Sequence, residues 1–353
     1  MEKDGKYRLE SSQIASSLME LFLNRMERVA NIIRENLKNF PTIEKYLKKS
    51  IDELIRKDPA YYLEQPLIRS IYFDETRNFL AKRFEKFLSF LIVKKKCRNI
   101  QSKISRLNED PPANFEEFYS ELRAAHYLLE ECEVKDTEFS TKGKHYDILY
   151  VNKSHNKGYV EVESLKSLDP YRDIFLNKIS AKEIFDPRYC KTYNILYQYP
   201  ENERVGIIHE KSRNEISKVV EDLGYELQKD NSFNLPIVDN NGNRKYEYLI
   251  KLNFTPCSNH RSGFLASGRT MDEFTIIQNL TSRITAHCDE AYSQLKKARN
   301  GNIRDNDLII ICLNFEDYQF YGNDLKKKLN EAINLWQSEP KKVIQIKLLE
   351  QKT

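Results

Sequence analysis

Apolar residues recur every three or four positions along the first third of the chain, which is the spacing of one face of an α-helix. The pattern predicts a long helix over residues 11–40, a shorter one over 42–57 and a second long one over 67–107. The first 110 residues are therefore expected to form an all-helical domain. Residues 108–112 end in two prolines, which predicts that the helical domain stops there.

From residue 111 onward, helical and strand patterns alternate. The predicted elements are a helix over 114–131, strands over 133–139, 146–151 and 158–164, a helix over 272–299, a strand over 307–313, a helix over 324–336 and a strand over 342–348. Short connections favour antiparallel pairing of the first three strands. The continuous apolar run at 308–313 is typical of a strand covered on both faces.

Two domains are therefore expected, a helical one at 1–110 and an α/β one at 111–353. Residues 166–270 show weaker patterns and are predicted to be an insertion in the second domain. Within it, residues 237–254 are expected to form a hairpin that turns at 240–242, because Asn-Gly supplies the positive backbone angles of a tight turn.

The charge of the chain is unevenly distributed. The net charge is +4, but residues 1–110 carry 23 Lys and Arg against 16 Asp and Glu, a net of +7, which leaves −3 for the rest. One interpretation of this asymmetry is that the chain has two parts that bind different partners. The six cysteines form no Cys-x-x-Cys pair, so the sequence indicates neither a zinc cluster nor a disulfide framework. A soluble, cytoplasmic protein is expected, since the start lacks an apolar signal-peptide core and no stretch is apolar enough to span a membrane.

The candidate chemistry lies on two neighbouring strands. Asp147 opens one of them, and Glu161 and Glu163 lie on the next, in the sequence Val-Glu-Val-Glu. Alternate side chains of a strand share a face, so the two glutamates point the same way and strand pairing would bring Asp147 beside them. Three such carboxylates favour a bound cation, and oxygen ligands select Mg²⁺, Mn²⁺ or Ca²⁺ over zinc. Alternatively, the glutamates form only the solvated face of a half-buried strand.

The order of these residues resembles the PD-(D/E)XK superfamily of restriction-endonuclease-like nucleases. The core of that family runs helix, three strands, helix, strand. Its signature is an Asp on the second strand and Glu-x-Lys on the third, often with a Glu from the first helix. Asp147, Glu161 and the helical Glu121 match these positions, whereas Glu163 stands where the signature has lysine. No nucleophile elbow, phosphate-binding Gly-Lys-Ser/Thr loop or His-Glu-x-x-His motif points to another class of enzyme.

The resemblance implies an α/β (α+β) fold with a mixed central sheet flanked by helices, and metal-dependent hydrolysis of nucleic acid, as in a DNA endonuclease of restriction or repair type. Asp147 and Glu161 would bind Mg²⁺ or Mn²⁺. Glu163 would position or deprotonate water, and Glu121 would assist the metal shell or an ordered water.

The missing lysine leaves several readings open. Lys166, just beyond the third strand, or Lys296, on the following helix, would supply the positive charge of an active enzyme. The same substitution is also compatible with a catalytically inactive nuclease fold that binds nucleic acid or a protein partner. A third hypothesis is a helical scaffold protein with no metal site.

Basic residues of the helical region are the candidate nucleic-acid contacts. The run consists of Lys94, Lys95, Lys96 and Arg98, with Arg83, Lys86 and Lys103 nearby. On a solvated helix face it would bind phosphates without sequence preference, and DNA is favoured over RNA. The helical region would clamp nucleic acid or mediate homodimerisation. His126 is expected to be structural, while His145 and the loop with His260 are weaker phosphate-binding candidates.

Overall fold

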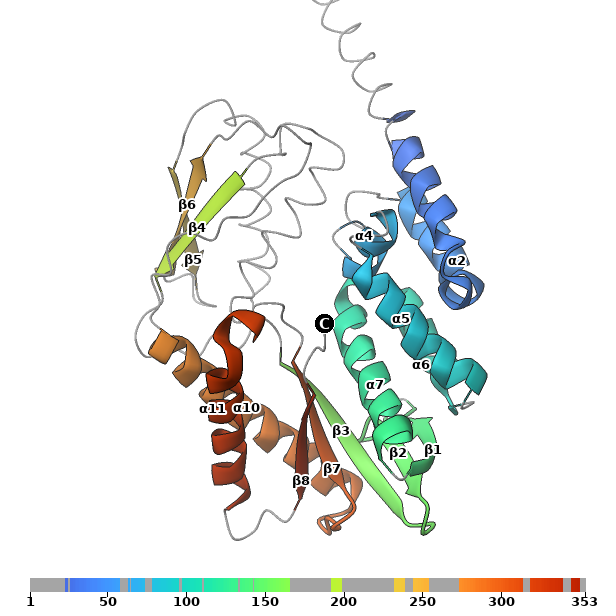
Figure 1. Ribbon diagram of the computed structural model, residues 1–353, viewed down its shortest axis with the longest axis vertical. Helices are drawn as coiled ribbons and strands as arrows, with labels where there is room; N and C mark the ends of the chain where they lie inside the picture. Colours follow the sequence, from blue (N-terminus) through green and yellow to red (C-terminus); the bar gives the residue numbers. More distant parts are fainter. Residues whose placement is uncertain are drawn as a thin grey trace, which may run out of the picture.

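The computed structural model describes part of the chain. The described residues are 23–24, 26–57, 63, 65–73, 78–94, 97–109, 111–132, 134–141, 143–165, 192–198, 232–238, 244–253, 273–313, 318–338 and 344–349. All structural statements below concern these residues. The fold is mixed α/β, with a helical N-terminal region followed by a five-stranded mixed sheet and its helices (Figure 1).

The N-terminal region contains several helices that pack through apolar faces. Helical residues 26–37 come first, and the labelled helices that follow are α2 (Pro41–Lys57), α4 (Pro66–Tyr72), α5 (Phe79–Ser89), the π-helical turn η1 (Phe90–Lys94) and α6 (Ile100–Glu109). Pro41 and Pro66 each occupy a first helical turn, where a missing N–H is tolerated. The helix predicted over 42–57 is thereby confirmed.

The single long helix predicted over residues 67–107 is wrong. The helix ends at Tyr72 and resumes at Phe79, and residues 97–99 leave the helical conformation again. Arg98 instead forms an isolated parallel bridge with Glu138, its N–H donating to the carbonyl of Thr137 at 3.2 Å. Asn99 takes a φ of 62°, a left-handed conformation in which a helix cannot continue. The pairing of Arg98 with Glu138 thus interrupts the helix, although the apolar residues keep a helical spacing.

Five strands form the main sheet in the order β1-β2-β3-β7-β8. Their bounds are β1 Val134–Phe139, β2 Ile148–Asn152, β3 Lys157–Leu165, β7 Leu308–Leu313 and β8 Gln345–Leu349. As predicted, the first three are antiparallel neighbours. β3, β7 and β8 are parallel, and β7 lies between β3 and β8 with residues 309–313 fully buried.

Helices cover both faces of this sheet (Figure 1). On one face, α7 (Pro111–Glu131) packs against Val160 and Val162 of β3 and the even-numbered residues of β7. On the other face, α10 (Glu273–Ala298) and α11 (Tyr318–Gln337) pack against Leu165 and the odd-numbered residues of β7. The alternation of β7 side chains between two cores explains its continuous apolar sequence.

The predicted boundary near residue 110 lies within a shared core. One cluster of buried residues runs from Val29 in the helical region to Cys312 in β7, and α6 packs against α7. The division into two domains stays a prediction. Inside the predicted insertion, β4 (Thr192–Gln198), β6 (Arg244–Asn253) and β5 (Ser232–Val238) form a separate antiparallel sheet, and β5 and β6 confirm the predicted hairpin.

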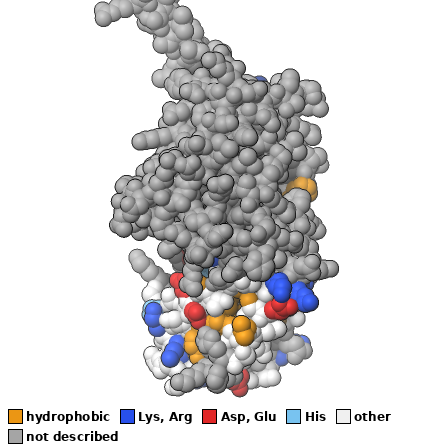
Figure 2. Space-filling model, turned by 90° about the vertical axis from the view of Figure 1, so that its left-hand side faces the viewer, with side chains coloured by type: hydrophobic (Ala, Val, Ile, Leu, Met, Phe, Trp, Pro, Cys, Tyr) orange, Lys and Arg blue, Asp and Glu red, His pale blue; other side chains and the backbone are white. Residues whose placement is uncertain are grey.

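Two surface properties bear on possible partners. Among the described residues, no helix has both the length and the apolar character needed to cross a membrane. The face seen from the side of α10 and α11 shows described side chains of both charges interspersed with apolar ones (Figure 2). The described part of that face therefore offers no uniformly basic surface.

Candidate functional site

Asp147 lies beside β3 at the point where β2 and β3 begin to pair. Ile148, the first residue of β2, lies opposite Val160, and Asp147 directly precedes it. The Asp147 N–H donates to the carbonyl of Val160 at 2.9 Å, and its Oδ2 accepts from the N–H of Val162 at 2.9 Å. These two bonds fix the Asp147 carboxylate against the backbone of β3 on either side of Glu161. The predicted convergence of the three carboxylates stays a prediction.

Glu121 joins the pair from α7 and brings a lysine with it. Its side chain is 2% exposed, and its carboxylate lies 2.6 Å from Nζ of Lys103, which is 4% exposed. Lys103 belongs to α6, where it shares the buried face of Ile100 and Ile104. The solvated position expected for Lys103 is therefore wrong, because α6 turns this face onto α7.

Burial is the main cause of a raised pKa in all three carboxyl groups. Burial, and next the charge of Asp147, raises the pKa of Glu121 to about 8, although Lys103 opposes the shift. Burial likewise raises the pKa of Asp147 to about 6, against the effect of Lys103 and the Val162 hydrogen bond. Glu161 is shifted most, since burial and then the charges of Asp147 and Glu163 raise its pKa to about 9.

These residues fit a hard divalent cation. Oε2 of Glu161 is buried and has no hydrogen-bond partner among the described residues. A buried carboxylate oxygen without a donor is costly unless it is protonated or binds a cation. The donor set consists of oxygen atoms, which suits Mg²⁺ or Mn²⁺. The alternative of a solvated acidic face does not fit Glu161, because this oxygen is withdrawn from water.

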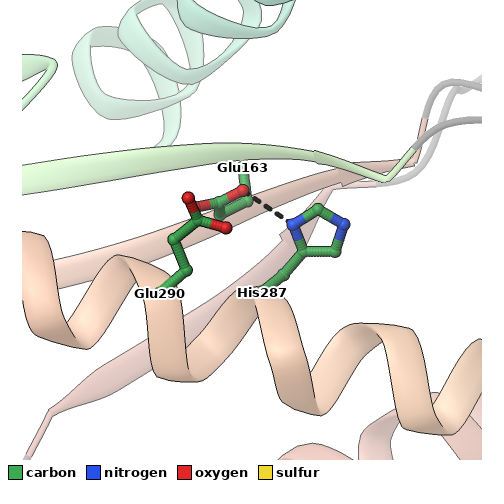
Figure 3. Close-up of side chains that lie close together, drawn as sticks. All are labelled: Glu163, His287 and Glu290. Atoms are coloured by element: carbon green, nitrogen blue, oxygen red, sulfur yellow. Dashed lines mark hydrogen bonds and ion pairs between the residues drawn. The ribbon is translucent and has the colours of Figure 1, made fainter. Parts of the chain in front are cut away.

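Glu163 lies next to a second group on α10 (Figure 3). His287 Nδ1 is 2.7 Å from Glu163 Oε2, and Glu290 approaches from one helical turn further on. One ligand atom from each of the three residues lies within 4.8 Å of the others. Because an ionised carboxylate can only accept, the hydrogen bond requires the proton on Nδ1 of His287. The histidine therefore orients Glu163, which is half-buried at the outer side of the cluster.

The remaining predicted site residues are placed apart from this cluster or are not described. Lys166 lies outside the described residues, as do Lys95, Lys96 and the side chain of Lys94. Lys296 is exposed in the last turn of α10. Arg98 is exposed but forms ion pairs with Asp136 and Glu138, so contact with a phosphate would have to replace them.

The histidine predictions have mixed outcomes. His126 packs between the rings of Phe87 and Phe90 and pairs with Glu130, which confirms the structural role expected for it. His145 is exposed near the start of β2, and His260 lies outside the described residues.

Sequence reasoning missed two residues of the site. Lys103 was grouped with its basic neighbours, but its positions relative to Ile100 and Ile104 already set it on an apolar face. His287 also has the spacing of a buried helix face, since it follows Ile284 by three residues and precedes Ala291 by four, and both of these are buried. A polar residue at the spacing of a buried face is the pattern that would have identified both.

Comparison of the chain with protein-family models, with curated proteins and with solved structures gave no match. The resemblance to the PD-(D/E)XK nucleases therefore stays a prediction, supported by the geometry of the site and the order of the strands.

Proposed function

We propose that the chain is a divalent-metal-dependent nuclease with a restriction-endonuclease-like core. The observation that supports the proposal is that Asp147 is hydrogen-bonded to the backbone of β3 on either side of Glu161, where a buried Glu161 oxygen lacks a partner among the described residues. Glu121 is buried on α7, and burial and next the charge of Asp147 raise the pKa of both Glu121 and Glu161. The element order from α7 through β1, β2 and β3 to α10 and β7 agrees with the core of that fold. A solvated acidic strand would not withdraw an oxygen of Glu161 from water.

Asp147 and Glu161 would hold a Mg²⁺ or Mn²⁺ ion. When bound, such an ion neutralises charge on a phosphodiester and lowers the pKa of a coordinated water. Glu163, oriented by His287, takes a proton from the attacking water. The water oxygen forms the new bond to phosphorus, the ester P–O bond breaks, and the leaving oxygen takes a proton from solvent. Glu121, paired with Lys103, supports the inner side of the cluster.

Supercoiled plasmid incubated with the chain and Mg²⁺ or Mn²⁺ tests the proposal. Nicking is expected from the native chain, and Asp147→Asn should reduce its rate by at least about 100-fold because a metal ligand is lost. Glu331→Gln, which changes an exposed carboxylate on α11, is the matched control and should leave the rate unchanged. Equal nicking by the Asp147 variant would overturn the proposal. Single-stranded RNA in a parallel assay separates the favoured DNA substrate from RNA.

A second candidate is a catalytically inactive nuclease fold that binds nucleic acid. The observation that favours it is Glu163, which stands in the place of the family lysine and is engaged by His287. Calorimetry with Mn²⁺ and a gel-shift assay separate the two functions. An inactive binding protein would retain DNA without nicking it, whether or not Mn²⁺ binds.

A further inference from the structure

Three planar side chains form a column beside the candidate metal site. The ring of Tyr146 stacks on the ring of Tyr159, with 4.4 Å between their centroids and 13° between their planes. The guanidinium of Arg299 covers Tyr159 at 3.8 Å from the ring centroid. One face of a ring cannot hold both groups at these distances, so Tyr159 lies between Arg299 and Tyr146. Tyr146 is therefore the outer member of the column.

Hydrogen bonds hold both ends of the column. Arg299 donates from Nε to the buried Asp307 at 2.9 Å, and the N–H of Tyr159 donates to the same carboxylate at 2.9 Å. At the other end, the residue after Tyr146 is Asp147, whose backbone N–H and C=O both form hydrogen bonds with neighbouring segments of the chain. The column is thus pre-organised, so a flat ligand that stacks on it incurs little cost for ordering the protein.

The column shares a face of β3 with the candidate metal site. Tyr159 and Glu161 are two positions apart on β3, and alternate side chains of a strand point to the same face, about 6.6 Å apart along the strand. Tyr146 directly precedes Asp147 in the chain. A flat group on the column would therefore lie next to a phosphate held at Asp147 and Glu161.

The outer ring reaches solvent close to basic residues. Tyr146 packs against the core shared by α10 and α11, but it is partly exposed and its hydroxyl has no hydrogen-bond partner among the described residues. Lys144 and His145, which come just before it, are exposed and form no ion pair within the described part of the chain. An aromatic surface beside cations is typical of sites for single-stranded nucleic acid, where bases stack and phosphates meet the cations.

We propose that Tyr146 binds an unpaired base of DNA by stacking, beside the candidate metal site and with Lys144 and His145 near the phosphates. Neighbouring bases cover both faces of a base inside a duplex, so the platform selects single strands or unpaired segments. Negative supercoiling favours such segments, which keeps a supercoiled plasmid a substrate. The inference rests on the proposed function, since the base belongs to the strand that the metal site would cut.

Fluorescence anisotropy in the presence of a chelator measures DNA binding without cleavage. The probes are a single-stranded oligonucleotide, its duplex, and an abasic strand of the same length, which carries the same phosphates but no bases. The native chain should bind the single strand more tightly than either of the other two. Tyr146→Leu should lower affinity for the single strand by about 5- to 100-fold, the range for loss of one stacked base, and leave affinity for the abasic strand unchanged.

Three further variants separate stacking from other roles. Tyr146→Phe and Tyr146→Trp should keep the native affinity, because the ring stacks and the hydroxyl is not needed. Phe79→Leu is the matched control, since it removes an exposed aromatic ring on α5, and it should bind all three probes as the native chain does.

The comparison of the two strands decides the outcome. Equal affinity of the native chain and Tyr146→Leu for the single strand would overturn the proposal. Equal losses for the single strand and the abasic strand, together with lower thermal stability, would show that Tyr146 only covers the core, and would overturn it as well. Binding of the duplex as tightly as the single strand would contradict the selection of unpaired bases.

A second variant makes the test if Tyr146→Leu does not fold. Tyr146→Trp adds an indole at the platform, and the one native tryptophan, Trp336, is buried. The single strand should quench the added emission and the abasic strand should not, whereas equal effects of the two would overturn the proposal.

The two proposals fail in different ways. Nicking of plasmid by the native chain, with no effect of Tyr146 on single-strand binding, would overturn this inference alone. The expected binding pattern without metal-dependent nicking would overturn the proposed function and would support a platform in the inactive DNA-binding alternative.

Discussion

The backbone of β3 holds Asp147 by hydrogen bonds on either side of Glu161. Hydrogen bonds from the Asp147 N–H to Val160 and from the Val162 N–H to Asp147 Oδ2, both 2.9 Å long, lie on either side of Glu161 in the sequence of β3. The Asp147 carboxylate cannot leave β3 without losing its bond to Val162, and after burial its charge is the next cause of the raised pKa of Glu161. Protonation of Glu161 or a bound cation would relieve this repulsion.

The metal-free chain is expected to lose stability as the pH rises from about 4.5 to about 9. The pKa of Asp147 is raised to about 6, that of Glu121 to about 8 and that of Glu161 to about 9. Over this range the folded state holds more protons than the unfolded state, so the free energy of unfolding falls with rising pH. Urea unfolding in the presence of a chelator, at pH 5 and at pH 8, measures the difference.

Glu161→Gln tests the pH dependence of stability at a single side chain. The amide cannot ionise, so this variant should be more stable than the native chain at pH 8 by about 1–3 kcal/mol and similar to it at pH 5. Glu331→Gln, on the exposed face of α11, should follow the native curve. The free energy of unfolding of the native chain and of the Glu161 variant could instead change equally with pH. That result would show that ionisation of Glu161 does not destabilise the fold.

Much of the fold followed from periodicity. Strands β1 to β3, the buried strand β7 and helix α7 lie close to the predicted positions, because one-sided or two-sided burial leaves a clear pattern in the sequence. The helix expected over 67–107 failed at Arg98, whose backbone pairs with β1. That pairing joins residues 40 positions apart, so the local pattern of apolar residues could not indicate it.

The candidate site was predictable where it depends on strand pairing. Asp147 lies against β3 as a consequence of the short connection between neighbouring strands. Lys103 and His287 depend instead on how α6 and α10 pack, which is set by side-chain fit across the core rather than by sequence order. Both were found only once the helices were in place.

His287 is expected to matter to turnover through Glu163. Replacement by Asn removes the ring that holds the Glu163 carboxylate at 2.7 Å and should lower the nicking rate by about 10–100-fold. Stability should change by less than about 1 kcal/mol, since both side chains are partly exposed. Plasmid nicking and urea unfolding of the same preparation measure the two effects.

Glu290→Gln is the matched variant for His287→Asn. If His287 only orients Glu163, the exposed Glu290 should be replaceable with less than about a twofold change in nicking rate. Equal losses of activity and of Mn²⁺ binding in both variants would show instead that the three residues of Figure 3 share an ion. An unchanged rate in His287→Asn would remove the orienting role.

Asp307 is expected to be essential for the fold and unimportant for the metal site. Its carboxylate is fully buried at the start of β7, where it accepts hydrogen bonds from Nε of Arg299 at 2.9 Å and from the N–H groups of Tyr159 and Arg304, each at 2.9 Å. The Arg299 guanidinium also stacks on the Tyr159 ring, 3.8 Å from its centroid. One carboxylate thus ties the end of α10 to the starts of β3 and β7.

Asp307→Asn keeps the shape of the side chain but turns one acceptor into a donor that faces other donors. It also leaves the partly buried Arg299 without its counter-charge, so the free energy of unfolding should fall by about 3–5 kcal/mol. Lys328→Met, which breaks an exposed ion pair with Glu331 on α11, should cost less than about 1 kcal/mol. Mn²⁺ affinity of the folded Asp307 variant should equal that of the native chain, because the carboxylate takes no part in the proposed metal site. A loss of affinity in protein that calorimetry and circular dichroism show to be folded would mean that the two regions are coupled through β3.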